Sequence, residues 1–339
     1  MRIRTALEDE RLTARIAERR PLLYTAGPSE PEDRPAHVRA ASGLVWLGRE
    51  LALVQDDADF VAFIEPVTGV VRALPLRRGE PARGARVIRQ FDDARGNKAD
   101  KLDLEALFAT DATLVGLGSG ATPARRRALL VDRAEAQVVS ADDLYRALEA
   151  MPELAGSELN LEGAAPVPDG RLRLFQRGNG DPARARPPID ATLDLPLAAL
   201  VAYLRGQAPA PPLDAGSIVQ YQLGALAGAR ATFTDAAHDP TSDRLYYLAC
   251  AERSPDAVRD GEVVGSALGV FDELDGGGAL RFARLVDDEG RPLAIKAEGL
   301  AFGSGAVHVV LDADDPARPS ELCRLELDGP WHPGASQRW

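Results

Sequence analysis

The sequence predicts an all-β fold, a β-propeller of four-stranded antiparallel blades around a central channel. Short alternating strands run through most of the chain, and a strand–turn–strand unit recurs at an interval above about 40 residues, which is typical of propeller blades. Each unit has a polar residue, a short strand of small and apolar residues, a tight turn and a second alternating strand. The alternative is an unrelated β-sandwich whose segments resemble one another by chance.

One polar marker residue identifies each unit. The markers recur about every 60 residues, above the roughly 40 residues that a four-stranded blade needs, and they are Ser42, Glu105, Glu162, Asp235 and Glu298. This spacing predicts five blades, or six if residues 81–97 form a degenerate blade. Residues 1–339 then make a single propeller domain. The N-terminal segment 11–23 supplies the missing outer strand of the C-terminal blade, which removes an exposed edge.

The remaining strands fit four to a blade. The first unit reads as GLVWLG, ELALVQDD, FVAFIEP and GVVRALPL, and the fourth reads as TDAAH, RLYYLACAE, VVGSALGVF and LRFARLV. Helical patterns are few. Residues 140–154 predict a short surface helix with Ser140 as its N-cap, and a second helix is expected from Pro196.

Composition limits the class of protein. The 339 residues are 45% hydrophobic, and the net charge of −12 argues against a surface for nucleic acid or anionic membranes. The charged N-terminus has no apolar signal-peptide core, and no segment approaches the length of a membrane span. Cys250 and Cys323 lie in apolar runs and suggest neither a disulfide scaffold nor a zinc site. We expect a soluble, cytoplasmic monomer.

The marker residues are expected to converge, because the first strand of every blade lines the central channel. Ser42, Glu105, Glu162, Glu298 and either Thr234 or Asp235 would form one ring. Carboxylates so close together repel one another unless they are compensated. A hard cation is one solution, and Ca²⁺ suits it because calcium takes 6–8 oxygen ligands in flexible geometry. Compensation by lysines that precede the ring carboxylates, Lys101 and Lys296, is the other.

Basic residues gather near the predicted ring and in the loops that open on the same face. They are Lys98, Lys101, Arg125, Arg126, Arg127, Arg177, Arg253 and Lys296. A cation surrounded by arginines suits a phosphate or a carboxylate, so a small anionic ligand is expected. The glycines of GLGSG do not precede a helix with Lys-Ser/Thr, which argues against a phosphate-binding P-loop. No catalytic residue can be assigned.

The segments NLEGAA and AEGLAF resemble the blade-start motif of phytase-like and SdiA-regulated propeller proteins. The whole chain looks like a bacterial propeller family of unknown function, with DLEALF, LNLEGAA, FTDAA, DGEVVGSALGV and DADDPARPSEL as hallmarks. The ring is also similar to that of the calcium-activated nucleotidases (apyrases), five-bladed propellers with a central calcium ringed by Ser, Glu, Glu, Ser and Glu. Ser42, Glu105, Glu162 and Glu298 match that order, whereas Thr234 or Asp235 replaces the second serine.

Three functions remain open at this point. The ring and the basic loops suit a calcium-dependent hydrolase of phosphate esters or anhydrides, in which the ion polarises an oxygen of the substrate. They also suit a non-catalytic propeller that binds a small ligand or a protein and uses the cation structurally. A glycosidase-like carboxylate pair is a third reading. Fold alone does not separate them.

Overall fold

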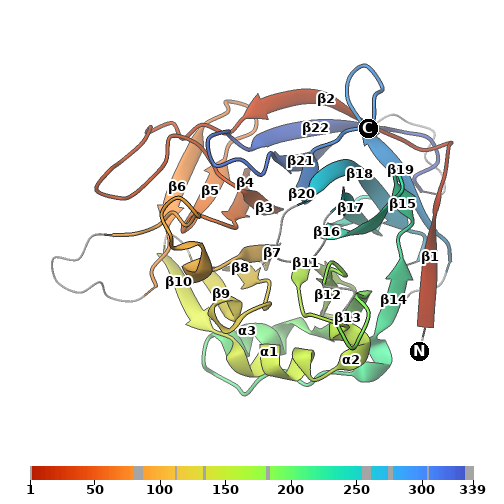
Figure 1. Ribbon diagram of the computed structural model, residues 1–339, viewed down its shortest axis with the longest axis horizontal. Coiled ribbons are helices and arrows are strands. Elements are labelled where there is room, and N and C mark those ends of the chain that lie inside the picture. The colour runs from red at the N-terminus through yellow and green to blue at the C-terminus, as the bar shows by residue number, and fades with distance from the viewer. Residues whose placement is uncertain are drawn as a thin grey trace.

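The computed structural model confirms the all-β prediction and shows a propeller-like arrangement of sheets around a centre (Figure 1). It describes residues 2–78, 87–110, 113–132, 135–180, 184–253, 261–273, 278–303 and 305–332.

Two four-stranded antiparallel sheets follow one another in the first half of the chain. The first consists of β3 (Ala41–Leu47), β4 (Glu50–Gln55), β5 (Phe60–Ile64) and β6 (Val71–Pro75). The second consists of β7 (Leu104–Ala109), β8 (Thr113–Gly118), β9 (Arg127–Asp132) and β10 (Glu135–Ser140).

The remaining strands belong to one 14-stranded sheet, in which three antiparallel sets are joined by N-terminal strands. One set is β11 (Leu161–Val167), β12 (Arg171–Gln176), β13 (Asp190–Pro196) and β14 (Val219–Gln222). The next is β16 (Ala229–Asp239), β17 (Arg244–Arg253), β18 (Glu262–Phe271) and β19 (Leu280–Val286), with β15 (Ala225–Leu226) beside β16. The last is β20 (Lys296–Gly303), β21 (Ala306–Asp312) and β22 (Glu321–Asp328).

The two N-terminal strands lie at the periphery and connect these sets. β2 (Thr13–Pro21) pairs antiparallel with β22 and so gives the last set a fourth, outer strand. β1 (Arg2–Glu8) pairs in parallel with β14 through residues 2–5 and with β19 through residues 6–8. The beginning of the chain therefore ties together strands that lie far away in sequence, as the right-hand and upper parts of Figure 1 show.

The first strand of each set lies nearest the centre (Figure 1). β3 contacts β7 and β20, β11 contacts β7 and β16, and β16 contacts β20, so these inner strands form a continuous ring of neighbours. Apolar side chains fill the space between adjacent sheets. Val54 and Val61, for example, pack in one core with Leu104 and Leu114 of the second sheet.

Burial explains the strand patterns. β5, with the sequence FVAFI, is buried at every position because both of its faces pack against other groups. The start of β2 instead alternates, with Thr13 and Arg15 exposed and Ala14 and Ile16 buried, as expected for a strand with one face in solvent.

The described helices are short and lie outside the sheets. They are α1 (Asp142–Glu149), α2 (Pro152–Ala155), α3 (Leu197–Leu204) and the 3₁₀ turns η1 (Lys98–Asp100), η2 (Pro123–Arg125) and η3 (Ala215–Ser217). The N-cap of α1 is Ala141, one residue beyond the expected Ser140, and it makes no capping hydrogen bond through its side chain. None of the described helices is both long and apolar enough to cross a membrane.

The segment that would hold a sixth blade, residues 81–97, is described only from residue 87 onward. That part contains no strand of its own, only the isolated bridge between Gln90 and Ala58.

Candidate metal centre

The same irregularity occurs in all five inner strands. Each is paired with its neighbour through a β-bulge, in which one residue has no partner across the ladder, and these residues are Gly43, Glu105, Glu162, Thr234 and Glu298. A bulge bends the strand and changes the direction of its side chains. In β7, β11, β16 and β20 the bulge residue is itself a predicted ring residue, whereas in β3 it is Gly43 and the neighbouring Ser42 stays paired with Val54.

Three of the predicted ring residues come together. Glu105 of β7, Glu162 of β11 and Glu298 of β20 each offer a carboxylate oxygen, and these oxygens all lie within 4.8 Å of one another. All three side chains are buried, with at most 8% of the residue surface exposed. Three sheets thus contribute one carboxylate each to a single point.

The hydroxyl groups of two further predicted ring residues make hydrogen bonds between inner strands. The Ser42 hydroxyl donates a hydrogen bond to Glu105 Oε2 at 2.5 Å and lies 3.5 Å from Glu298 Oε2. The Thr234 hydroxyl donates to the backbone carbonyl of Ala297 at 2.5 Å, so it ties β16 to β20. Both are oxygen donors, and the arrangement contains no sulfur or imidazole ligand.

Basic groups compensate two of the three carboxylates. Lys296 Nζ lies 2.6 Å from Glu298 Oε1, and Arg177 Nη1 lies 3.3 Å from Glu162 Oε1. Glu162 Oε1 also accepts a hydrogen bond from Asn160, at 2.7 Å. Within the part of the chain that the structure describes, no lysine or arginine lies within 4 Å of the Glu105 carboxylate, whose partner is the neutral Ser42 hydroxyl.

The second carboxylate oxygen of Glu162 makes no hydrogen bond with the described residues. This atom, Oε2, is buried. An uncompensated buried oxygen of a carboxylate is costly, because burial removes the water that would solvate it. A cation bound by the Glu162 carboxylate would lower this cost.

The ionisation of the three glutamates reflects this crowding. Burial, followed by repulsion from Glu162, raises the pKa of Glu105 well above its ordinary value. Burial also raises the pKa of Glu162 to about 7, although the Arg177 guanidinium opposes this rise. The pKa of Glu298 is raised by burial against the opposing effect of Lys296. Without a cation, the ring therefore resists full ionisation near neutral pH.

Asp235 has a different environment from its neighbour Thr234. Thr234 occupies the bulge, whereas Asp235 pairs across the ladder with Leu248. Asp235 Oδ2 accepts a hydrogen bond from the backbone N–H of Leu300 at 2.7 Å, which connects β16 to β20. Burial raises the pKa of Asp235 well above its ordinary value. Thr234 and Asp235 therefore both connect β16 to β20, and Asp235 Oδ1 is buried without a hydrogen-bond partner among the described residues.

The predicted basic residues divide into two groups. Lys101, Arg125, Arg177 and Lys296 lie near the carboxylates: Lys101 and Arg125 contact Asp103, at 2.7 and 2.8 Å.

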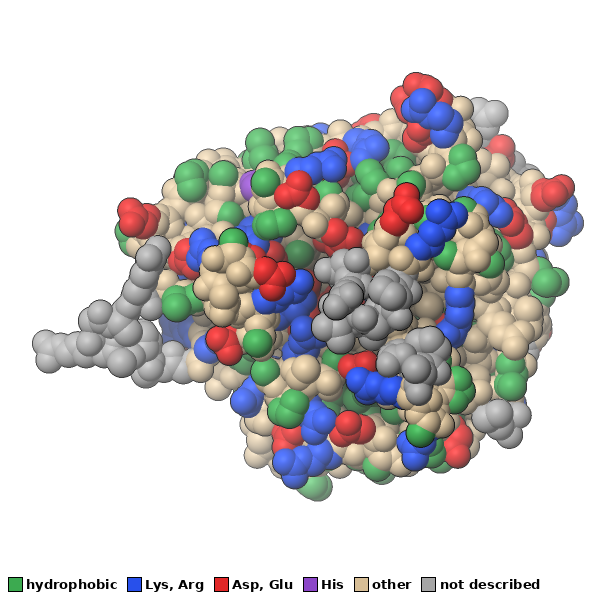
Figure 2. Space-filling view, viewed as in Figure 1, with side chains coloured by type: hydrophobic (Ala, Val, Ile, Leu, Met, Phe, Trp, Pro, Cys, Tyr) green, Lys and Arg blue, Asp and Glu red, His purple; other side chains and the backbone are tan. Residues whose placement is uncertain are grey.

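The other basic residues do not join this group. Arg126 pairs with Glu149 of α1, Lys98 with Asp93, and Arg253 lies near Glu262. Arg127 is exposed at the start of β9. Figure 2 accordingly shows basic and acidic side chains intermixed on the face that it presents, and no uniformly basic surface.

Sequence reasoning overlooked two acidic residues beside the ring, Asp56 and Asp103, which lie with Glu105 in a second carboxylate group. In KLDLE the residues Lys101, Asp103 and Glu105 alternate with leucines, and this alternation is the one signal for Asp103 in the sequence. It is incomplete, because alternate residues share a side only in extended chain, whereas Asp103 has a φ of +55°. Asp56 comes from the loop after β4 and has no comparable signal.

Comparisons with known proteins identify one family and several solved structures. A family model described as a family of unknown function (DUF6929) matches residues 37–327. No curated protein matches the chain.

Among solved structures, the chain is similar to the Malassezia sympodialis allergen Mala s 1, at 11% identity and a TM-score of 0.44, covering 84% of this chain and 92% of that one. It is also similar to a member of the DUF4221 family from Bacteroides vulgatus, at 9% identity and a TM-score of 0.44, covering 95% of this chain and 100% of that one. A third is the PQQ-bound aldose sugar dehydrogenase from Streptomyces coelicolor, at 11% identity and a TM-score of 0.41, covering 95% and 100%.

Proposed function

We propose that this chain, which belongs to the family of unknown function DUF6929, is a five-bladed propeller that binds one divalent cation, Ca²⁺ above others, at its centre. The observation that carries the proposal is the meeting of Glu105, Glu162 and Glu298 within 4.8 Å. The buried, unpartnered Oε2 of Glu162 supports it independently, because it is a ligand atom without a partner among the described residues.

The chemistry of the donors favours calcium over transition metals. The ring consists of carboxylate and hydroxyl oxygens, which suit hard cations, and it contains no cysteine or histidine ligand. Calcium accepts 6–8 oxygens at about 2.3–2.6 Å in variable geometry, whereas Mg²⁺ requires a near-ideal octahedron at shorter distances. Ligands from separate sheets are set by the packing of those sheets, so the more tolerant ion fits better.

The cation would join the inner strands of three sheets. Glu105, Glu162 and Glu298 come from β7, β11 and β20, which are distant in sequence. An ion that binds the folded state alone stabilises it by about 2.7 kcal/mol at a hundredfold excess over its dissociation constant. We therefore propose first a structural and ligand-binding role for the ion.

A calcium-dependent phosphohydrolase is the second candidate, and Arg125 favours it because its side chain lies near the carboxylates and is 24% exposed. Arg177 favours the first candidate. Its Nε donates to Thr232 at 3.1 Å, its Nη1 lies 3.3 Å from Glu162, and its Nη2 lies 2.5 Å from Glu252. A guanidinium held in this way supports the ring, whereas a phosphate clamp requires donors that are directed at the ligand.

Titration calorimetry on chelator-treated protein tests the proposal. We expect one Ca²⁺ per chain and weaker binding of Mg²⁺. Glu162→Gln should weaken calcium binding by more than about tenfold, whereas the exposed Glu135→Gln should have no effect. Absence of calcium and magnesium binding by the wild-type protein would refute the cation.

The same preparations decide between the two candidates. Release of inorganic phosphate from ATP and from p-nitrophenyl phosphate is measured with Ca²⁺ and with chelator. Phosphate release that requires Ca²⁺ and is lost in Glu162→Gln would establish the hydrolase. Calcium binding without phosphate release would leave the non-catalytic role.

A further inference from the structure

A second group of carboxylates adjoins the first and shares one member with it. Asp56, Asp103 and Glu105 also offer oxygens that lie within 4.8 Å of one another. Asp56 follows β4, and Asp103 immediately precedes β7. Glu105 therefore belongs both to this group and to the ring formed with Glu162 and Glu298.

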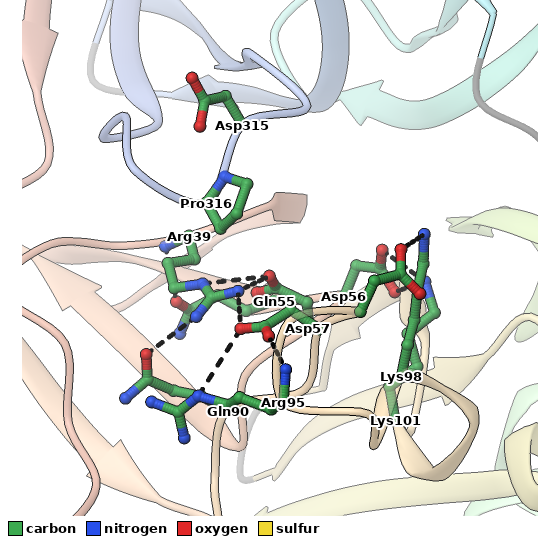
Figure 3. Close-up of polar contacts among 12 residues, drawn as sticks. Arg39, Gln55, Asp56, Asp57, Gln90, Arg95, Lys98, Lys101, Asp315 and Pro316 are labelled. Carbon is green, nitrogen blue, oxygen red and sulfur yellow. Dashed lines mark hydrogen bonds and ion pairs between the residues drawn. The ribbon is translucent and has the colours of Figure 1, made fainter.

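A lysine lies between the two aspartates of this second group. Lys101 Nζ is 2.6 Å from Asp56 Oδ1, 2.7 Å from Asp56 Oδ2 and 2.7 Å from Asp103 Oδ1. Lys101 is 7% exposed, so the ammonium group has largely exchanged water for these oxygens. Figure 3 shows Lys101 and Asp56 directed toward each other from separate segments.

The other side of Asp103 is also occupied. Its Oδ2 accepts a hydrogen bond from Ser119 and lies 2.8 Å from Arg125 Nη1. Asp103 itself has a positive φ of 55°, which is uncommon for a residue other than glycine. The fold thus holds this carboxylate in one orientation, with Oδ1 directed at Lys101.

We propose that the Lys101 ammonium is a built-in cation that occupies a second metal position and limits the centre to one exchangeable divalent ion. The inference rests on the proposed cation at the ring of Glu105, Glu162 and Glu298. Lysine suits this task because its ammonium is a compact point charge with three donors. Its three close oxygen contacts are the contacts that a bound metal ion would make with Asp56 and Asp103.

Removing the charge of Lys101 by substitution tests this role directly. Two metal ions can lie about 3.5–4 Å apart in a protein site, and the two groups here share the Glu105 carboxylate. Lys101→Met keeps an unbranched chain of similar length but removes the charge. It leaves Asp56 and Asp103 without the cation that lies between them, so a divalent ion should replace the ammonium.

The test is the number of Ca²⁺ ions bound per chain, measured by calorimetry and by metal analysis after gel filtration. We expect one ion in the wild type and two in Lys101→Met. Lys296→Met is the matched control: Lys296 contacts only Glu298 among the described carboxylates, so its removal should add no ion. An unchanged number of ions in Lys101→Met would overturn the inference.

The same counts separate this inference from the proposed function. If the wild type binds no ion and Lys101→Met binds one, the ring proposal fails and the role of Lys101 stands. If the wild type binds one ion and Lys101→Met also binds one, the ring proposal stands and the role of Lys101 fails.

The melting temperature of Lys101→Met is a second test. Lys101→Met should melt at a much lower temperature than the wild type in chelator, and Ca²⁺ should restore most of the difference. A variant that is unfolded with and without Ca²⁺ would contradict the replacement of the ammonium by calcium. The double variant Lys101→Met/Asp56→Asn removes one charge of each sign and should again bind one ion.

Discussion

Glu105→Gln should have opposite effects on the calcium-free and calcium-bound protein. The substitution keeps the shape of the side chain and removes a charge that no lysine or arginine among the described residues contacts. Two ionised carboxylates whose nearest oxygens lie at most 4.8 Å apart would repel by about 3.5 kcal/mol or more at an effective dielectric constant of about 20. The raised pKa of Glu105 means that the calcium-free ring avoids this repulsion by taking up a proton, which also costs free energy as the pH rises. Removing Glu105 from the ring should therefore stabilise the calcium-free protein by about 3 kcal/mol at pH 8.

The assay is thermal unfolding followed by circular dichroism, with chelator and with saturating Ca²⁺. For a chain of 339 residues, about 3 kcal/mol corresponds to a rise of about 4 °C in melting temperature. In Ca²⁺ the order should reverse, because the variant has lost a ligand and binds the ion weakly. Glu135→Gln, on the exposed surface, should behave as wild type in both buffers. A Glu105→Gln variant that is destabilised equally in both buffers would refute the reasoning.

Three further predictions follow from the same structure. In chelator, the free energy of unfolding should fall by about 3 kcal/mol from pH 5 to pH 8. Burial raises the pKa of Glu162 to about 7 in the folded protein, so the stabilisation by its protonated form, which is complete below pH 4.5, is lost as the pH rises through 7. Each unit of difference in pKa corresponds to about 1.36 kcal/mol. Saturating Ca²⁺ should reduce this fall, and an identical pH profile in both buffers would contradict it. Gly43→Ala should lower the free energy of unfolding by about 2–4 kcal/mol, because its φ is +59° and the added Cβ would lie 2.8 Å from Leu107 Cβ. The control Gly48→Ala, at φ +64° with open space around it, should lower it by only about 1–2 kcal/mol. Equal losses of the two variants in urea unfolding would refute the close contact at Gly43. Deleting residues 2–21 should lower the melting temperature strongly, because it removes the partner of β22 and the buried Ile16, and an unchanged melting temperature would show that the closure contributes little.

The pattern of alternating strands predicted the fold class because it reflects local geometry and burial. The segment GLVWLG corresponds to β3, and RLYYLACAE corresponds to β17, which is almost entirely buried. The recurring markers were visible for the same reason. A polar residue among small apolar ones stands out when the strand on either side of it is buried, as around Glu162.

The exact ring could not be read from the chain, because the deciding feature is a bulge. A bulge changes which of two adjacent side chains faces the centre, and Thr234 and Asp235 are equally suitable by residue type. The sequence also did not show which basic residues neutralise which carboxylates. Lys296 and Lys101 each lie two residues before an acidic residue, but the approach of Asp56 to Lys101 depends on the packing of one sheet against the next.

The loop arginines show the limit of reasoning from charge alone. Arg125, Arg126 and Arg127 are consecutive, yet they extend to different surroundings: Arg125 contacts Asp103, Arg126 contacts Glu149, and Arg127 is exposed. A run of like charges in a loop specifies no common direction for its side chains. Their directions are set by η2 and by the start of β9.

Anomalous diffraction from crystals soaked in Ca²⁺ tests the central claim most directly. The account predicts one strong calcium peak at the centre, about 2.3–2.6 Å from oxygens of Glu105, Glu162 and Glu298, and no peak between Asp56 and Asp103, where Lys101 lies. Absence of a central peak at saturating Ca²⁺, with the Lys296 ammonium lying between the three carboxylates instead, would contradict it.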